Sequence, residues 1–350
     1  MQFKIGNFDI ADGKVFIVAE LSANHNHKFE IAVESIKTAK ECGADAIKVQ
    51  TYTADTLTLN SNKECFKIQQ GTVWDGISLY DLYQQAYTPW EWHPKLKKTA
   101  EDLDLVFFST PFDKTAVDFL EKMNVPAYKI ASFEIVDLPL IQYTASKGKP
   151  IIISTGIATE EEIKDAVDTC REAGNNQIAL LKCTSEYPAP IEDANLKMIP
   201  LLSEKFNVVA GLSDHTLGVT VPIAAASIGA KIIEKHFILD RKIGGPDSSF
   251  SLEPNEFKNM VDSIKQVEKA LGKINFELSD KTKKSRKFAR SLFAVKDIKK
   301  GEKFSDDNIR SVRPSDGLPP KYLEDIIGKT ALTDIETGTP LNWNIIGKDS

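Results

Sequence analysis

The chain has 350 residues, which is enough for one large domain and a small second one. Its 42% hydrophobic and 27% charged residues are ordinary for a soluble globular protein and exclude the disordered, collagen-like and coiled-coil classes. The formal net charge of -6 argues against a nucleic-acid-binding surface, which needs a clustered excess of basic residues.

Eight short, β-branched runs alternate with helical patterns along most of the chain. They occupy residues 14–21, 46–52, 105–110, 127–132, 150–155, 178–184, 208–215 and 231–237. Each run is almost continuously apolar, which is typical of parallel strands buried on both faces. Eight strand–helix units predict a (β/α)₈ TIM barrel over residues 1–272. An open doubly wound sheet is the alternative, and it would need no pairing between the first and last strands.

Between these runs, apolar residues recur at helical spacing. One such face lies before the second run and consists of Phe29, Ala32, Val33, Ile36 and Ala39. Thr159 and Glu162 fit a capping box that begins another helix, whose apolar stripe is Ile163, Ala166, Val167 and Cys170. A third stripe follows the eighth run and consists of Phe257, Met260, Val261, Ile264 and Val267.

Three segments do not fit a regular barrel unit. Residues 53–104 are too long for an ordinary connection and contain two helix-like stretches, 78–86 and 89–103, so we expect a structured insertion near the site. Residues 273–287 are polar and charged and predict a linker. Residues 288–350 are short runs separated by turns, which predict a small, mostly irregular, β-rich module that packs on a barrel, its own or a partner's.

Polar residues recur near the carboxyl end of all eight runs, where TIM-barrel enzymes place their active sites. In chain order they are Glu20, Lys48, Gln50, Thr110, Lys129, Ser132, Glu134, Ser154, Thr155, Thr184, Ser185, Ser213, Asp214, His215, Glu234 and His236. A single polar strand end carries little information, but this repetition predicts an enzyme.

Two of these strand ends carry lysines. A lysine at a strand end is often only solvated or salt-bridged. However, Lys48 and Lys129 among serine and threonine hydroxyls favour a pocket for a phosphate or carboxylate, because they combine charge with directional donors.

Histidines mark the last two strand ends. His215 and His236 are two of five histidines, and imidazole is a common ligand of first-row metals. The alternative is a pair of buried, hydrogen-bonded histidines. We expect a divalent metal, Mn²⁺ or a similar ion acting as a Lewis acid, with Glu20 or substrate oxygens completing its coordination.

Several loop residues remain open to two interpretations. Asn24 and His25 could bind a ligand or satisfy the backbone of their own loop, whereas His93 is expected to be structural. Tyr187 is expected to shape its loop, with contact to a ligand as the alternative. Asp247 follows the eighth run on a glycine-rich loop, and such loops often close over substrates.

The cysteines and the N-terminus bear on location. Cys42, Cys65, Cys170 and Cys183 form no CxxC pair. With no secretory signal and no apolar run of the about 20 residues that a membrane span needs, we expect a cytoplasmic protein with reduced thiols and no membrane partner.

Eight motifs in fixed order resemble the sialic acid synthase family: AELSANH, IKVQTY, STPF, YKIASFE, ISTG, KCTSEYP, GLSDHT and EKHF. The resemblance covers essentially the whole chain, since residues 288–350 are similar to the family's antifreeze-like (SAF) domain. Ser22, Asp247-Ser248 with FSLEP, the LYDLYQQAYTPWEWH stretch and VRPSDGLPP favour the pseudaminic branch of the family. Members that make N-acetylneuraminic acid typically carry Gly and His at the positions of Ser22 and Ser248, and His27 also replaces a commoner Gly.

The resemblance implies a condensation of phosphoenolpyruvate with an acetamido sugar that releases phosphate. For the pseudaminic branch the acceptor is 2,4-diacetamido-2,4,6-trideoxy-L-altrose; the alternative is an N-acetylneuraminic or legionaminic acid synthase that uses N-acetylmannosamine or a related sugar. The residues implied to bind phosphoenolpyruvate are Lys48, Thr110, Lys129, Ser132, Ser154, Ser185 and Ser213.

The remaining roles follow from the same resemblance. His215 and His236 would hold the metal, with Mn²⁺ preferred over Mg²⁺ or Co²⁺. Those implied to address the sugar or a metal-bound water are Glu20, Gln50, Tyr187 and Asp247, while Glu134 is the candidate acid or base. Arg313 resembles the family's arginine that reaches a partner's barrel to contact an acetamido group, which implies a domain-swapped homodimer.

The residues leave rival functions to consider. Lys129 could instead form a Schiff base in a metal-independent aldolase, which would require its amine to be deprotonated. A sugar-binding or ice-binding protein that uses only residues 288–350 is disfavoured, because it would leave the polar strand ends without a role.

Overall fold

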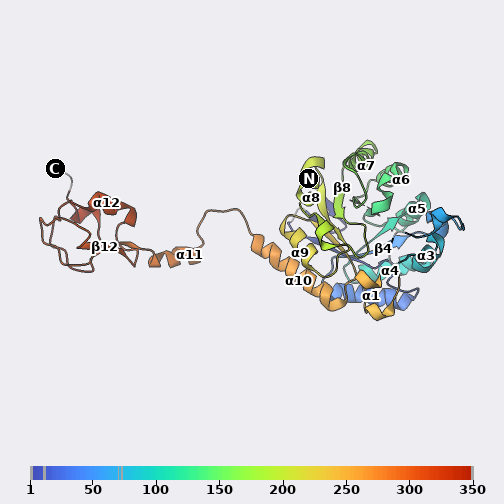
Figure 1. Cartoon of the computed structure of the whole chain (residues 1–350), viewed down its shortest axis with the longest axis horizontal. Helices are drawn as coiled ribbons and strands as arrows, with labels where there is room; N and C mark the ends of the chain where they lie inside the picture. The colour runs from blue at the N-terminus through green and yellow to red at the C-terminus, as the bar shows by residue number, and fades with distance from the viewer. Residues whose placement is uncertain (1–2, 11–12, 70, 72–73, 348–350) are drawn as a thin grey trace. The chain divides into compact units, whose positions relative to one another are not determined.

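The computed structural model describes residues 3–10, 13–69, 71 and 74–347 (Figure 1). The chain divides into two compact units, Met1–Gly272 and Lys273–Ser350. Among the described residues, no helix is both long and apolar enough to cross a membrane.

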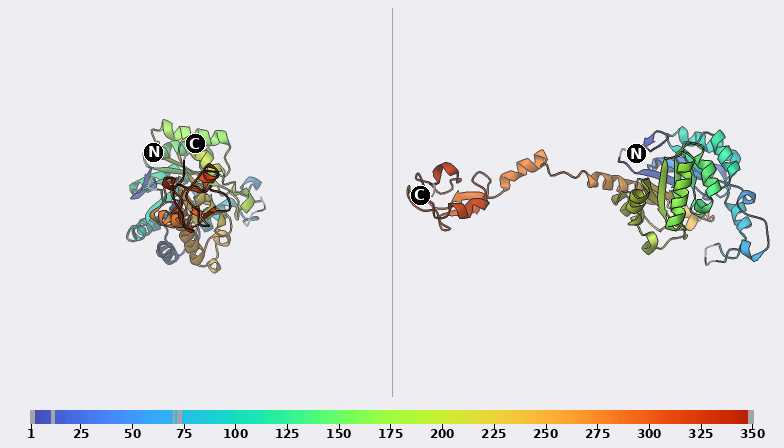
Figure 2. Two further views of the ribbon diagram at one scale, coloured as in Figure 1. Left: turned by 90° about the vertical axis from the view of Figure 1, so that its left-hand side faces the viewer. Right: turned by 90° about the horizontal axis from the view of Figure 1, so that it is seen from above.

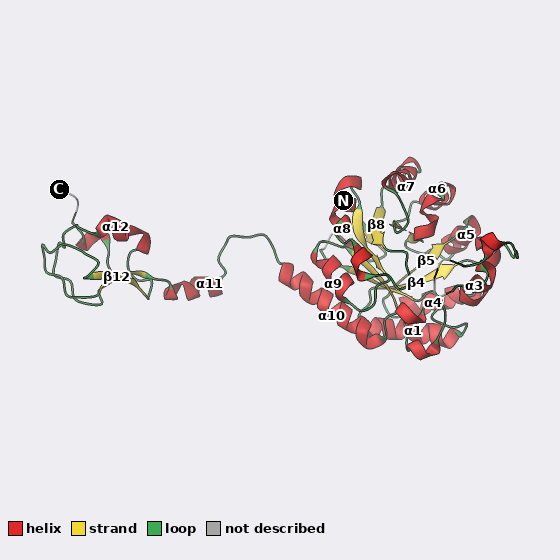
Figure 3. Cartoon of the chain, in the orientation of Figure 1, coloured by secondary structure: helices red, strands yellow, loops and turns green. Residues whose placement is uncertain are grey.

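The described part of the first unit contains a closed barrel of eight parallel strands surrounded by helices (Figures 2 and 3). The strands are β3 (Phe16–Glu20), β4 (Ala46–Thr51), β5 (Val106–Pro111), β6 (Tyr128–Ile130), β7 (Ile151–Ser154), β8 (Ile178–Cys183), β9 (Val209–Asp214) and β10 (Ile232–His236). Strand β10 pairs with β3 from Ile232↔Phe16 to His236↔Glu20. This closure confirms the TIM barrel, and the open sheet is wrong.

An outer ring of helices packs on these strands. It comprises α1 (Phe29–Glu41), α4 (His93–Glu101), α5 (Lys114–Lys122), α6 (Leu138–Ala145), α7 (Glu160–Glu172), α8 (Met198–Phe206), α9 (Thr220–Ser227) and α10 (Pro254–Leu271). The predicted capping box of α7 is present: the backbone N–H of Thr159 donates to Glu162 Oε2 at 2.8 Å, and that of Glu162 donates to Thr159 Oγ1 at 3.3 Å. The apolar stripe behind it is buried.

The amino end of the barrel is filled by apolar side chains. A short hairpin, β1 (Lys4–Ile5) and β2 (Phe8–Asp9), precedes the first barrel strand, and sequence patterning did not predict it. Phe3, Ile5 and Ile10 join Phe108 and Leu181 in one buried cluster inside the barrel. The polar residues are therefore left to the carboxyl end of the strands.

The segment after β4 combines an insertion with a regular barrel helix. It contains α2 (Ala54–Leu57), the 3₁₀ turn Glu64–Phe66, α3 (Leu79–Ala86) and the 3₁₀ turn Trp90–Trp92. The second stretch assigned to the insertion forms α4, whose Leu96 and Ala100 are buried in the main core. Because α4 packs as one of the ring helices, the extra structure ends before it.

The remaining 3₁₀ turns follow barrel strands. They are Ser132–Val136 after β6, Ile191–Ala194 after β8, and Arg241–Ile243 and Ser248–Phe250 after β10. The first of them carries Glu134, and the last begins directly after Asp247.

The second unit begins with an exposed segment and continues as a small module. Part of the expected linker is helical, as α11 (Asp280–Ser285) and the 3₁₀ turn Arg286–Phe288. Strands β11 (Ser291–Ala294) and β12 (Ile309–Val312) pair antiparallel, and η9 (Pro320–Tyr322), α12 (Leu323–Ile326) and η10 (Trp343–Ile345) follow. Most of the module is irregular around its own apolar core, as expected for a SAF domain.

Candidate active site

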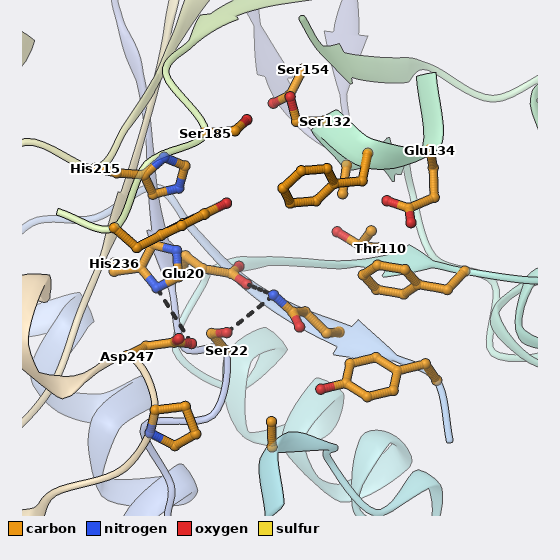
Figure 4. Close-up of a pocket in the computed structure, with 18 of the residues that line it drawn as sticks. Glu20, Ser22, Thr110, Ser132, Glu134, Ser154, Ser185, His215, His236 and Asp247 are labelled. Carbon is orange, nitrogen blue, oxygen red and sulfur yellow. Dashed lines mark hydrogen bonds and ion pairs between the residues drawn. The ribbon is translucent and has the colours of Figure 1, made fainter. Parts of the chain in front are cut away.

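A cavity of about 360 Å³ opens at the carboxyl ends of the barrel strands (Figure 4). The predicted site residues that line it are Glu20, Lys48, Gln50, Thr110, Lys129, Ser132, Glu134, Ser154, Ser185, Tyr187, Ser213, His215, His236 and Asp247. Arg313 belongs to the second unit, where it is exposed and directly follows β12. The structure thus brings together the first-unit residues to which the resemblance assigns a role, whereas the strand-end residues Thr155, Thr184 and Asp214 do not line the cavity.

One side of the cavity gathers hydroxyl groups around Lys129. The ammonium of Lys129 donates to Ser154 Oγ at 2.6 Å and to the carbonyl of Ile130 at 3.1 Å, and its side chain is almost fully buried. The hydroxyl of Ser132 is buried without a hydrogen-bond partner. Figure 4 shows Ser132, Ser154 and Ser185 close together on this side. We call Lys129, Ser132, Ser154 and Ser185 the hydroxyl cluster.

Gly156 keeps the hydroxyl cluster open, and the sequence prediction missed it. A Cβ at this position would collide with Ser185 Oγ and would lie 2.6 Å from Ser132 Oγ. Gly156 lies two residues after the end of β7 and directly follows the apolar run 150–155, so the only signal in the sequence was a glycine immediately after a predicted strand.

Lys48 lies at the centre of a second buried cluster. Its ammonium is 2.8 Å from Glu20 Oε2 and 3.6 Å from Glu234 Oε1, and it donates to Thr110 Oγ1 at 3.2 Å. Glu234 also accepts a hydrogen bond from Ser213 Oγ at 3.2 Å. The alternative of a salt-bridged lysine therefore holds for Lys48, and Glu234 is a site residue to which sequence analysis gave no role.

Burial and charge set the ionisation of this cluster. Burial raises the pKa of Glu20 to about 7, although the charge of Lys48 opposes the shift. Burial also works against the charged form of Lys48, but the two carboxylates outweigh it and raise the pKa of the ammonium. Lys48 therefore remains charged at neutral pH and holds its carboxylate partners in place.

His215 and His236 lie at the opposite edge, with ring centroids 5.3 Å apart. The Nδ1 atom of His215 bonds the carbonyl of Thr184 at 2.9 Å, an arrangement that leaves Nε2 to a metal ion. His236 Nδ1 is buried without a hydrogen-bond partner and lies 3.9 Å from Asp247 Oδ2. Burial lowers the pKa of His236, so its ring is neutral at pH 7.

This donor set fits a metal with two protein imidazoles. The described residues contain no group of three or more His, Cys, Asp or Glu side chains arranged to hold an ion. Glu20 in particular is paired with Lys48 rather than with the histidines. Oxygen atoms of substrate or water would have to complete the coordination.

The loop after β3 and the loop after β10 form the next part of the wall. Gln50 Nε2 donates to Glu20 Oε1 at 3.1 Å and to Ser22 Oγ at 3.0 Å, and the backbone N–H of Ala23 donates to Asp247 Oδ2 at 3.5 Å. Figure 4 shows His236, Asp247 and Ser22 together, away from the hydroxyl cluster. Burial raises the pKa of Asp247.

Glu134 stands apart from these clusters. Its Oε2 atom is buried without a hydrogen-bond partner, and burial raises the pKa of the carboxyl to about 7. A carboxyl with this pKa can accept a proton in one step and return it in another at neutral pH.

The loop residues left open by the sequence have structural partners. Asn24 donates to the carbonyl of Phe237 at 2.9 Å and to Ser251 Oγ at 2.8 Å. His25 Nε2 is 3.0 Å from Thr88 Oγ1, and neither residue lines the cavity. His93 contacts Thr51 Oγ1 at 2.9 Å, also outside the cavity. These three side chains secure loops around the site.

The two positions that depart from family glycines have backbone conformations that glycine favours. Ser22 has φ 44° and His27 has φ 52°. His27 holds its position by contacting the carbonyl of Gln85 at 3.0 Å and the ring of Tyr87, with ring centroids 5.1 Å apart. It thereby ties the first loop to the end of the insertion.

Tyr187 links the histidine edge to the insertion. Its ring centroid is 4.4 Å from that of His215 and 5.5 Å from that of Trp74. Because it also lines the cavity, Tyr187 both shapes its loop and faces the ligand space.

The chain was compared with protein families and with known proteins. Residues 35–276 match the NeuB family, and residues 289–346 match the SAF domain. The chain is 53% identical to the pseudaminic acid synthase of Campylobacter jejuni over 97% of its own length and 98% of the relative's. It is 52% identical to the pseudaminic acid synthase of Helicobacter pylori, over 93% of this chain and 96% of that one.

Two solved structures are similar to this chain in both sequence and fold. The spore coat polysaccharide biosynthesis protein SpsE of Bacillus subtilis is 37% identical, with a TM-score of 0.67 and all of both chains covered. The N-acetylneuraminic acid synthetase of Leptospira borgpetersenii, solved with citrate, is 31% identical, with a TM-score of 0.73 over 81% of this chain and 95% of that one.

Proposed function

The chain belongs to the NeuB family, and from that premise we propose that it condenses phosphoenolpyruvate with 2,4-diacetamido-2,4,6-trideoxy-L-altrose and water to give pseudaminic acid and phosphate. The observation that carries the proposal is the 53% identity over nearly the full length to a pseudaminic acid synthase. The polar cavity supports it. Buried cations and hydroxyls are available for the anionic substrate, and the histidines form a separate edge for the sugar.

The hydroxyl cluster would bind phosphoenolpyruvate together with Lys48, Thr110 and Ser213. Lys129 and the serines supply a charge and several donors within one buried pocket, which suits a phosphate. Lys48 would contribute the second positive charge while remaining bound to its carboxylates. Because these groups are already in place, little reorganisation is needed when the anion binds.

The histidine edge would hold a divalent cation, with Mn²⁺ preferred and Mg²⁺ or Co²⁺ as alternatives. The unpartnered, buried Nδ1 of His236 and the free face of His215 fit this role. When bound, such an ion would supply Lewis acidity at the aldehyde oxygen of the acceptor. Glu20, Gln50 and Asp247 would position the sugar or a bound water beside it.

The reaction joins C3 of phosphoenolpyruvate to C1 of the open-chain sugar. Water then adds at C2, and the tetrahedral adduct loses phosphate. We assign Glu134 to the activation of that water, since its carboxyl lies in the cavity, has an unpartnered oxygen and has a pKa of about 7. A general base of this kind is typically worth about 10²–10⁴-fold in rate.

The active form would be a homodimer in which each second unit serves the partner's barrel. Arg313 is exposed in the second unit, directly after β12. Its guanidinium is suited to binding an acetamido carbonyl. The enzyme is expected to act in the cytoplasm.

A phosphate-release assay tests the substrate. The expected result is faster release from phosphoenolpyruvate with the diacetamido-trideoxy-altrose than with N-acetylmannosamine. Faster turnover of N-acetylmannosamine would refute this substrate and favour an N-acetylneuraminic acid synthase. That alternative has some support in the 31% identity to the Leptospira enzyme.

One observation favours a Schiff-base aldolase as a second candidate. Burial lowers the pKa of Lys129, which is the direction that a Schiff-base lysine requires. Against it, the amine donates to Ser154 and sits among hydroxyls suited to an anion. Borohydride reduction in the presence of pyruvate decides between them, because a covalent adduct on Lys129 would exclude the anion-binding role.

A further inference from the structure

The cavity has an apolar side that the proposed chemistry does not use. It is lined by Leu57, Ile68, Leu79 and Leu82, which we call the aliphatic wall. All four belong to the insertion between β4 and α4, and Leu57 lies on α2 while Leu79 and Leu82 lie on α3. The polar groups described above come instead from the barrel strands and the loops that follow them.

The aliphatic wall is held by its own hydrogen bonds. Thr53 caps α2 and Ser78 caps α3. Tyr80 on α3 donates its hydroxyl to Asp55 on α2 at 3.1 Å. The backbone N–H of Ile68 donates to the carbonyl of Ile77 at 3.0 Å. The wall is therefore a built surface before any ligand arrives.

Aromatic rings connect the wall to the barrel. Tyr52, which directly follows β4, contacts Tyr83 on α3 and Phe112 after β5, with ring centroids 5.7 and 5.1 Å apart. The indole N–H of Trp74 donates to the carbonyl of Pro246 at 3.2 Å. These contacts place the insertion over the carboxyl end of the barrel, on the mouth side of Lys48 and Lys129.

The direction of the acceptor follows from this arrangement. Its C1 must lie deep in the cavity, next to the phosphoenolpyruvate bound at the hydroxyl cluster, because C1 is the carbon that forms the new bond. The rest of the six-carbon chain then extends toward the mouth, and C6 is the carbon farthest from the reacting atoms. In the proposed acceptor, C6 is a methyl group rather than a hydroxymethyl group.

Resting on the proposed function, we propose that the aliphatic wall is the specificity-determining surface for the C6 methyl group of the acceptor. Moving a methyl group from water to an apolar surface lowers its free energy. A hydroxyl at C6 would lose its water without finding a partner among leucine and isoleucine side chains. Discrimination by one such group in a hydrophobic pocket is typically about 10- to 100-fold in kcat/KM.

The test compares two sugars and three variants. The sugars are the diacetamido-trideoxy-altrose and its 6-hydroxy analogue, 2,4-diacetamido-2,4-dideoxy-L-altrose. The wild-type enzyme is expected to prefer the 6-deoxy sugar by about 10- to 100-fold in kcat/KM. Leu57→Asn and Leu79→Asn place an amide of similar size in the wall, and each is expected to reduce this preference roughly tenfold.

Leu59→Asn is the matched control, since Leu59 is two residues from Leu57, is 65% exposed and does not line the cavity. It should leave the preference unchanged. The KM for phosphoenolpyruvate should stay at the wild-type value in all three variants. Leu57 and Leu79 are only partly buried, and thermal melts check that both variants fold.

The outcomes separate the two proposals. If the wild-type enzyme uses both sugars equally well, or if neither wall variant changes the ratio of kcat/KM for the two sugars, the aliphatic wall does not recognise the C6 methyl group. The inference then fails while the proposed function stands. If the wild-type enzyme releases no phosphate with either sugar, the proposed function fails, and the inference fails with it.

Discussion

Lys48 and Glu20 occupy paired positions on neighbouring strands, and their side chains form a buried ion pair with Nζ 2.8 Å from Oε2. Glu234 on β10 lies 3.6 Å from the same ammonium, so one cation serves two buried carboxylates. A buried charge that loses its partner is strongly destabilising. The pair therefore links the stability of the barrel to its binding site.

Replacing Lys48 by Met should lower both the stability of the barrel and the binding of phosphoenolpyruvate. We expect the free energy of unfolding to fall by about 3–5 kcal/mol, because two buried carboxylates lose their counter-charge. Urea denaturation measures this loss, and steady-state kinetics should show a higher KM for phosphoenolpyruvate. Adding Glu234→Gln should recover part of the stability but none of the activity. A Lys48→Met enzyme of normal stability would contradict the ion pair.

Glu134 should control the acid limb of the pH–rate profile. Its pKa is raised to about 7 by burial, so the carboxyl is protonated and inactive as a base below that pH. The value of kcat/KM should therefore rise with pH and level off above about 7. Glu134→Gln should remove this limb and lower kcat by about 10²–10⁴-fold.

Glu186→Gln provides the control for Glu134, since Glu186 is exposed and does not line the cavity. It should keep the wild-type profile. If the limb survives in Glu134→Gln, the titrating group is a different one, and Glu20 is the next residue to test because its pKa is also about 7.

Gly156→Ala should displace the hydroxyl cluster. The added Cβ would press on Ser185 Oγ and Ser132 Oγ. A misplacement of about 1 Å in such a site can cost on the order of 10²-fold in rate, so we expect a loss of that size in kcat/KM for phosphoenolpyruvate. Combining it with Ser185→Ala removes the nearest obstacle and should be less harmful than the single change. An active Gly156→Ala enzyme would argue against anion binding at these serines.

Removal of divalent metal should abolish turnover. Dialysis against EDTA is expected to inactivate the enzyme, and Mn²⁺ should restore it. Binding of Mn²⁺, followed by electron paramagnetic resonance, should be lost in His215→Gln and in His236→Gln. His93→Gln is the control, because His93 is buried away from the cavity and should keep Mn²⁺ binding even if stability falls. Full activity after complete metal removal would sink the metal site.

Arg313 should act on the partner's barrel. Arg313→Ala and His215→Ala subunits, each inactive alone, should regain activity when mixed, because the heterodimer contains one complete site. The measurement is turnover after mixing and subunit exchange. If mixing restores nothing although size-exclusion and mass analysis show heterodimers, Arg313 acts within its own chain.

The barrel could be predicted because each strand is buried on both faces and leaves a continuous apolar run. Its closure was the natural consequence of eight such units, and the pairing of β10 with β3 confirms it. The hairpin of β1 and β2 was missed because each strand has only two residues, which is too short for any periodicity. Helix α4 was assigned to the insertion because its sequence gives no sign of which partner it packs against.

The site was predictable in outline for a related reason. Parallel strands bring their carboxyl ends to one face, so polar strand ends such as Ser154 and His236 had to meet. What the sequence could not show is pairing across that face. The contact of Glu234 with Lys48 depends on the pairing of β10 with β3 that closes the barrel, and the role of Gly156 depends on the distance to two other loops.

The packed amino end of the barrel has a consequence for the order of events. Phe3, Ile5 and Ile10 close that end, so both substrates use the opening at the strand tips. A substrate bound deep in the cavity is then covered by the substrate that binds nearer the opening. We expect the enzyme to load phosphoenolpyruvate before the sugar, and to keep phosphate until the nine-carbon product has moved away from the mouth.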